Sequence, residues 1–227
     1  MRFYLPWVYL VVAAVEIWAE FTGNSQLRFL AKPLLMPVLM LWYRAAAPKP
    51  NSSITRLLLF AFAFSWVGDV ALMFVFKNEI FFLVGLVGFL ITHVLYAFVF
   101  NKVTSKEVVA LLPQKWWITL PLVAYFLALV SVIFPPVPAD MKVPVAVYSS
   151  VIAVMVIFAL NRYQRVSDLS FVYVMAGALL FMFSDSLIAI NKFVCNGELY
   201  LSGVWIMILY IAGQYLIAKG LLVQEQK

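Results

Sequence analysis

Long apolar segments separated by short polar breaks occupy almost the whole chain. A helix needs about 20 apolar residues to cross the hydrocarbon core of a membrane. Eight segments approach that length, and they span residues 4–21, 29–43, 54–76, 80–100, 116–134, 143–160, 169–190 and 199–218. The chain is therefore predicted to be an all-α polytopic membrane protein with eight transmembrane helices, and residues 1–227 form a single integral membrane domain.

Composition supports this prediction. Hydrophobic residues make up 66% of the chain and charged residues 11%, whereas a soluble domain has about 25% charged residues. The first segment contains Glu16 and Glu20 and lacks a small-residue cleavage signature, so we interpret it as a helix and not as a removable signal peptide. The lipid bilayer is thus the expected surrounding of nearly every helix.

The net charge of +6 comes from basic residues that are scattered among the loops. Because they form no basic stripe with interleaved aromatics, no nucleic-acid partner is expected. Basic residues are enriched in cytoplasmic loops. Eleven of the 16 Lys and Arg residues lie at the termini or in the loops on the same side as the termini: Arg2, Arg44, Lys49, Arg56, Lys102, Lys106, Lys115, Arg162, Arg165, Lys219 and Lys227. This distribution predicts that both termini are cytoplasmic. In a bacterium the membrane would be the inner (cell) membrane. The single Cys195 excludes an intrachain disulfide and a multi-cysteine metal site.

Two of the apolar segments carry an aspartate directly after a small residue. Asp69 follows Gly68, and Asp185 follows Ser184. Both segments run outward in the predicted topology, and a rise of 1.5 Å per residue places each aspartate about 10 Å below the outer end of its helix. An ionisable residue at such depth is costly and indicates a functional site, the alternative being a structural pair with a lysine.

The spacing around the two aspartates is also similar. Lys32 precedes Asp69 by the same number of residues as Tyr148 precedes Asp185. This spacing suits two four-helix halves related by a parallel repeat, with the repeat axis along the membrane normal.

Further polar side chains are expected to converge on the aspartates. Lys32 and Tyr148 belong to the outer third of the bundle, while His93, Tyr210 and Gln214 lie nearer the midplane. Each has an alternative: the lysine can extend its ammonium group to the interface, and the others can be interhelical hydrogen-bonding residues.

Small or polar residues lie on the same helical stripes as these groups. Gly85, Phe89, His93 and Tyr96 recur at helical spacing, which predicts a face packed inside the protein. Gly177 precedes Asp185 on its stripe and predicts close helix packing there.

Two carboxyl groups in a largely apolar pocket favour one protonated and one ionised member. Such a pair is equipped for acid-catalysed hydrolysis. The sequence contains no Gly-x-Ser-x-Gly elbow, no Walker loop and no His-Glu-x-x-His segment. A metal site would require Asp69, His93 and Asp185 to converge, and neither a metal nor another cofactor is expected.

Several segments together resemble one family. They are VGDVALMF, GLVGFLITHVLYAF, GALLFMFSDSLIAINKF and YIAGQYLIAKG, with AKPLLMP upstream. In this combination the chain resembles the YhhN-like lysoplasmalogenase family of integral membrane proteins, from the second predicted helix to the last. The polar positions of the family pattern correspond to Lys32, Asp69, His93, Tyr96, Ser184, Asp185, Asn191, Lys192, Tyr210 and Gln214.

The resemblance implies hydrolysis of the vinyl ether bond of lysoplasmalogens. The products would be a fatty aldehyde and glycerophosphocholine or glycerophosphoethanolamine. Asp69 and Asp185 are the expected acid and base. The remaining positions would bind or orient the substrate or water: His93, Tyr96, Tyr210 and Gln214 around the reacting groups, Lys32 and Lys192 at the phosphate, and Ser184 and Asn191 beside them. Tyr148, selected by its spacing from Asp185, is expected in the same role.

Two alternatives belong to other classes. A proton-coupled small transporter or lipid permease would use the aspartates as coupling groups and leave its ligand unchanged. A ceramidase-like zinc hydrolase would need bound metal, and the single histidine argues against it.

Overall fold

The computed structural model describes residues 3–105 and 107–225, and this part of the chain contains helices and no strand. Arg2, Lys106 and Lys227, which enter the charge argument above, lie outside the described residues. The helices are α1 (Leu5–Thr22), α2 (Ser25–Ala46), α3 (Ser53–Leu72), α4 (Ile80–Lys102), α5 (Leu111–Gln114), η1 (Trp116–Thr119), α6 (Leu120–Ile133), α7 (Ala139–Leu160), α8 (Asp168–Ala189), the π-helix η2 (Ile190–Val194) and α9 (Ser202–Glu225).

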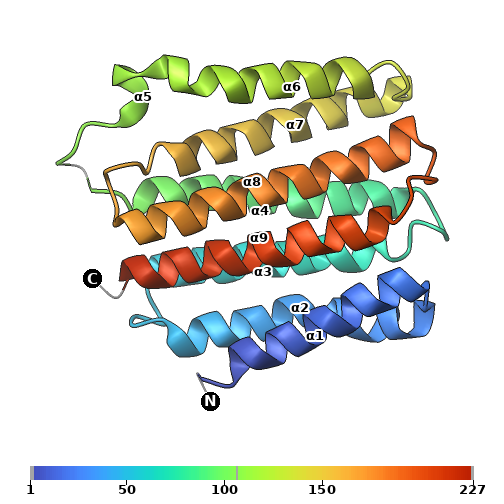
Figure 1. Ribbon diagram of the computed structural model, residues 1–227, viewed down its shortest axis with the longest axis horizontal. Coiled ribbons are helices and arrows are strands. Elements are labelled where there is room, and N and C mark those ends of the chain that lie inside the picture. Colours follow the sequence, from blue (N-terminus) through green and yellow to red (C-terminus); the bar gives the residue numbers. More distant parts are fainter. Residues whose placement is uncertain (1–2, 106, 226–227) are drawn as a thin grey trace.

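The long helices lie side by side in two layers (Figure 1). Helices α1, α9 and α8 form one layer, and α2, α3 and α4 form the other. Helix α7 contacts both α4 and α8 and closes one edge, and α6 lies outside it. Both chain ends lie at one end of the bundle, and the α1–α2, α3–α4 and α8–α9 connections lie at the opposite end.

Seven helical segments are long and apolar enough to cross a membrane, which makes this a multi-pass membrane protein by length and composition. Helix α2 is not among them. It forms where the second span was predicted, but Arg28, Lys32 and Arg44 and two internal prolines reduce its apolar character. The eighth crossing and the cytoplasmic position of the termini therefore stay predictions.

The end of α3 differs from the predicted one. Helix α3 ends at Leu72, followed by turns to Lys77, although the apolar run continues to residue 76. The Phe74 ring packs on Phe29 and Phe81, so tertiary aromatic contacts fold the end of the run back. Asp69 consequently lies within the last turn of α3 and not about 10 Å below its end.

Glycines bring pairs of site-bearing helices into close contact. A Cβ at Gly177 of α8 would lie 2.7 Å from the Gly213 carbonyl oxygen of α9, and one at Gly88 of α4 would lie 2.9 Å from the Phe64 carbonyl oxygen of α3. Small residues allow membrane helices to approach this closely. The packing predicted at Gly177 and along the inner face of α4 is confirmed, since Gly85, Phe89, His93 and Tyr96 are all buried.

Helix α6 is attached differently from the rest. Ile133 is its only buried residue, and its contacts with α7 are sparse, whereas α1 packs closely on α2. Under a repeat of two four-helix halves these two pairs would correspond. The repeat therefore stays a prediction.

Candidate active site

Asp185 lies in the penultimate turn of α8, buried at the junction of three helices. Its Oδ2 is 2.8 Å from His93 Nε2 of α4 and accepts a hydrogen bond of 2.8 Å from the Tyr148 hydroxyl of α7. The His93 ring nitrogen and the Tyr148 hydroxyl are 3.3 Å apart. Two donors converging on one oxygen are the arrangement that stabilises a carboxylate.

The environment of His93 determines its tautomer. Its Nδ1 atom is buried without a hydrogen-bond partner, and its ring packs against Phe181 at 4.7 Å between centroids. A bare ring nitrogen is less costly there than an unpaired N–H. We therefore assign the proton to Nε2, from which His93 donates to Asp185.

Asp69 faces the same region from α3 and is also buried. Its Oδ2 accepts a hydrogen bond of 2.5 Å from the Tyr210 hydroxyl of α9. The Tyr210 ring is held by Phe89 and Phe181, with centroids 5.9 and 5.3 Å away. Lys32 and Asp185 both lie within electrostatic range of Asp69.

A polar cavity of about 270 Å³ lies between the two aspartates and the bundle end away from the chain termini. Asp69, Asp185 and Tyr210 line its inner part, and Glu20, Arg28 and Lys32 contribute its other charged groups. The Oδ1 atoms of Asp69 and Asp185 form no hydrogen bond within the described chain, and they are not fully enclosed by protein. These oxygens are therefore the ones available to a ligand in the cavity.

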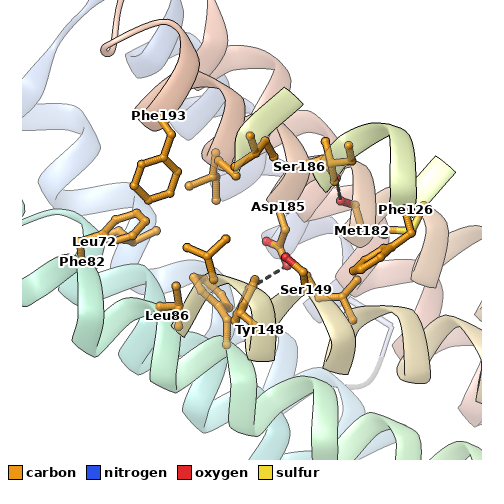
Figure 2. Close-up of a pocket in the computed structure, with 17 residues that line it drawn as sticks. Leu72, Phe82, Leu86, Phe126, Tyr148, Ser149, Met182, Asp185, Ser186 and Phe193 are labelled. Carbon is orange, nitrogen blue, oxygen red and sulfur yellow. Dashed lines mark hydrogen bonds between the residues drawn. The ribbon is translucent and has the colours of Figure 1, made fainter. Parts of the chain in front are cut away.

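An apolar pocket of about 60 Å³ meets this cavity at Asp185 (Figure 2). Figure 2 shows the Asp185 carboxylate beside Tyr148, with Leu72, Leu86, Phe82 and Phe193 around the same space. Helix α6 covers the pocket with Phe126, Leu129 and Ile133. Asp185 lines both spaces, together with Leu72, Phe89 and Ile188.

Behind the cavity, a buried hydrogen-bonded chain links three helices. The Tyr96 hydroxyl donates to Gln214 Oε1, the Gln214 amide donates to Ser65 at 2.9 Å, and Ser65 donates to Thr92 at 3.2 Å. Tyr96 and Gln214 do not line the polar cavity. Any effect of these two predicted site residues on a ligand is therefore indirect.

Ser184 and Asn191 line the cavity as predicted site residues, but their side chains also hold the fold. The Ser184 hydroxyl donates to the Ile206 carbonyl at 3.0 Å. Asn191 Oδ1 accepts from the Leu199 amide at 3.1 Å, which fixes the segment between η2 and α9.

The two predicted phosphate lysines are placed differently. Lys32 lines the polar cavity, and its ammonium group forms no ion pair within the described residues. Lys192 does not line it: its Nζ is 2.6 Å from Glu79 Oε2 and lies over the Phe82 ring, beside a separate cavity. The ion pair and the ring contact hold Lys192 outside the polar cavity, a placement that the sequence did not predict.

Arg28 and Glu20 were missed as site residues. Arg28 lies one turn before Lys32 on α2, so the same helical face carries both cations into the cavity. That spacing was a usable signal. Glu20 lies 3.7 Å from Arg28, a contact across the α1–α2 turn. No set of three His, Cys, Asp or Glu side chains in the described ranges is placed to hold a metal ion.

The helices and this site define a class: a polytopic membrane protein with two buried carboxyl groups at the meeting point of a charged cavity and an apolar pocket. A model described as the YhhN family matches residues 27–221, so the chain belongs to the YhhN family. Comparisons with curated proteins and with solved structures gave no match.

Proposed function

We propose that this protein hydrolyses the vinyl ether bond of lysoplasmalogens. The observation that carries the proposal is the position of Asp185, which lines both the charged cavity and the apolar pocket. A lysoplasmalogen has its reactive bond between a charged head and a hydrocarbon tail. Membership of the YhhN family agrees with a hydrolase.

The substrate would lie across the junction of the two spaces. Its phosphate would reside with Lys32 and Arg28, whose side chains face the polar cavity. Its tail would follow the apolar pocket under α6. The vinyl ether would then lie beside Asp185, with Asp69 on the polar side.

Vinyl ether hydrolysis begins with protonation of carbon. One carboxylic acid gives its proton to the β-carbon, and the ether oxygen donates its electron pair to form an oxocarbenium ion. The other carboxylate stabilises this cation and takes a proton from the attacking water, which gives a hemiacetal. In the collapse of the hemiacetal, the carboxylate that gave up its proton takes one from the hemiacetal hydroxyl, and the other carboxyl group gives its proton to the glycerol oxygen as the bond between carbon and that oxygen breaks. The aldehyde and the neutral alcohol leave, and both carboxyl groups return to their starting states.

Neighbouring groups would hold the two carboxyls in position. His93 and Tyr148 fix one oxygen of Asp185, and Tyr210 fixes one oxygen of Asp69. In each aspartate the second oxygen remains for the substrate or for water. The cavity has room for water, since one molecule occupies about 30 Å³ of liquid volume.

The test is aldehyde release by the detergent-purified protein from an alkenyl glycerophosphoethanolamine. We expect aldehyde and glycerophosphoethanolamine in equal amounts, and no aldehyde from the matched saturated ether. A folded protein that releases no aldehyde would contradict the proposal. Proton-linked lipid flux in vesicles of such a protein would favour the transporter alternative.

A further inference from the structure

The charges of the polar cavity are of both signs and are ordered along its depth. Asp69 and Asp185 lie at the inner part. Lys32 comes next along α2, and Arg28 lies about 6 Å further toward the bundle end, at one helical turn. Glu20 lies beside Arg28, at 3.7 Å.

We infer that Glu20 binds the cationic amine of the substrate headgroup and makes the site selective for zwitterionic lysolipids. This inference rests on the proposed function. From the reacting bond outward, the ligand carries a glycerol, a phosphate and an amine. The cavity presents Lys32 and, one turn further out, Arg28 with the Glu20 carboxylate beside it.

Glu20 has unused hydrogen-bonding capacity. A carboxylate has two oxygens and about four acceptor sites, and the contact with Arg28 uses one oxygen at 3.7 Å. The Glu20 side chain is 11% exposed, so its charge is poorly solvated while it faces the cavity. An ammonium group placed there would compensate that charge.

Arg28 is likewise incompletely satisfied. Its Nε atom is buried and has no hydrogen-bond partner. The rest of the guanidinium is more open, since the Arg28 side chain is 37% exposed and lines the cavity, and a phosphate between Arg28 and Lys32 would accept hydrogen bonds from it. Glu20 would then be released in part from Arg28 and be available to the amine.

The sum of charges also argues for a zwitterion. Three carboxyl groups line the cavity, from Glu20, Asp69 and Asp185, against the two cations Arg28 and Lys32. With one aspartate protonated, as the proposed reaction requires, the two remaining carboxylates balance the two cations, and a headgroup with a phosphate alone would leave the cavity with a net negative charge. A headgroup that adds an amine brings no net charge.

The position of Glu20 depends on helix α9. The Glu20 carboxylate occupies the space that a Cβ at Gly203 would take. Gly203 is thus a positioning residue for the proposed amine site. Gly203→Ala would displace the carboxylate without removing its charge.

The test compares two saturated-ether lysolipids that differ only beyond the phosphodiester, one with ethanolamine and one with glycerol. Neither can be hydrolysed, so binding is measured without turnover, from the dependence of the unfolding temperature on ligand concentration. We expect the purified protein to bind the ethanolamine lipid at least about tenfold more tightly, which corresponds to the lower end of the range for a hydrogen bond to a charged group.

Two variants connect this ratio to the residue. Glu20→Gln should bring the ratio close to one, and Gly203→Ala should lower it. Glu79→Gln is the matched control, because Glu79 pairs with Lys192 outside the polar cavity, and it should leave the ratio unchanged.

A ratio near one in the unaltered protein, or a ratio that survives Glu20→Gln, would overturn the inference. The unaltered protein suffices for the first outcome, whatever the variants do to folding. Aldehyde release at equal kcat/KM from the two corresponding vinyl ethers would overturn the inference and leave the proposed reaction standing. Selective binding without aldehyde release would overturn the proposed reaction and leave the amine site standing.

Discussion

Asp185 and Asp69 are buried to a similar degree but are held by different numbers of donors. One oxygen of Asp185 accepts hydrogen bonds from His93 and Tyr148, while one oxygen of Asp69 accepts a hydrogen bond from Tyr210 alone. A hydrogen bond to a charged group contributes about 1.5–3 kcal/mol. The tyrosines therefore keep the carboxyl groups oriented toward the shared cavity.

Removing either hydroxyl should slow the reaction without unfolding the protein. We expect Tyr148→Phe and Tyr210→Phe each to lower kcat about tenfold, because one oriented hydrogen bond to a reacting carboxyl group is lost. The measurement is steady-state aldehyde release. Tyr125→Phe is the control, since Tyr125 donates to Ser186 and not to an aspartate. Equal rates in all three variants would contradict a role of the Tyr148 and Tyr210 hydroxyls in orienting the carboxyl groups.

The sequence singled out Asp69, Asp185 and Lys32 because charged groups stand out in apolar segments, and the three line one cavity in the structure, while their roles stay predictions. It placed His93 near the aspartates but could not predict that His93 contacts Asp185 and not Asp69. That contact depends on the rotation of α4 relative to α8, which packing determines. Lys192 was predicted at the phosphate but pairs with Glu79, the N-cap residue of α4, and spacing along the chain cannot predict a contact between residues so far apart.

At the scale of helices, apolar length predicted where almost every span lies. The ends were less predictable because tertiary contacts decide them. Aromatic packing at Phe74 ends α3 early. The predicted span 116–134 corresponds to Trp116–Ile133, which begins with a 3₁₀ turn before Pro121 in the first turn of α6. Proline favours such a start because it lacks an amide donor.

The α8–α9 contact should be sensitive to a single methyl group. At Gly177 a Cβ would lie 2.7 Å from a backbone oxygen, which cannot move as a flexible side chain does. We expect Gly177→Ala to lower the unfolding temperature by about 5 °C, as overpacking costs about 1–3 kcal/mol. Val172→Ala on the exposed side of α8 is the control. An unchanged unfolding temperature for Gly177→Ala would mean that the contact relaxes freely.

Helix α2 is expected to cross the membrane despite its charges, since it lies lengthwise between α1 and α3 (Figure 1). In a Cys195→Ala background, cysteines at Asn24 and at Asn51 should lie on opposite sides of the membrane. An impermeant maleimide applied to intact cells should label the first and spare the second. Labelling of both from one side would mean that α2 does not cross.

At the scale of the whole molecule, two helix layers enclose the charged cavity while the loosely attached α6 covers the apolar pocket. This division provides separate spaces for the headgroup and the hydrocarbon tail of the proposed lysolipid substrate. Composition and hydropathy predicted the membrane fold. They could not predict the division, because it arises from the relative placement of helices far apart in the chain.

A side chain that fills the apolar pocket should discriminate between tails. Leu129 of α6 lines the pocket, whereas Leu127 on the same helix is 64% exposed. We expect Leu129→Trp to raise KM for a long-chain substrate severalfold and to spare a short-chain analogue. Leu127→Trp should leave KM unchanged for both the long-chain and the short-chain substrate. Equal effects of Leu129→Trp on both chain lengths would contradict the tail position.

The most direct measurement is the rate of aldehyde release from an alkenyl glycerophosphoethanolamine by Asp69→Asn and Asp185→Asn. Asp140→Asn is the control, since Asp140 lies at the start of α7 outside the polar cavity. Acid or base catalysis typically contributes 10²–10⁴-fold. We therefore predict that both site variants lose at least about a hundredfold in rate while still binding the saturated-ether lysolipid. Wild-type rates in either folded site variant would contradict the two-carboxylate mechanism.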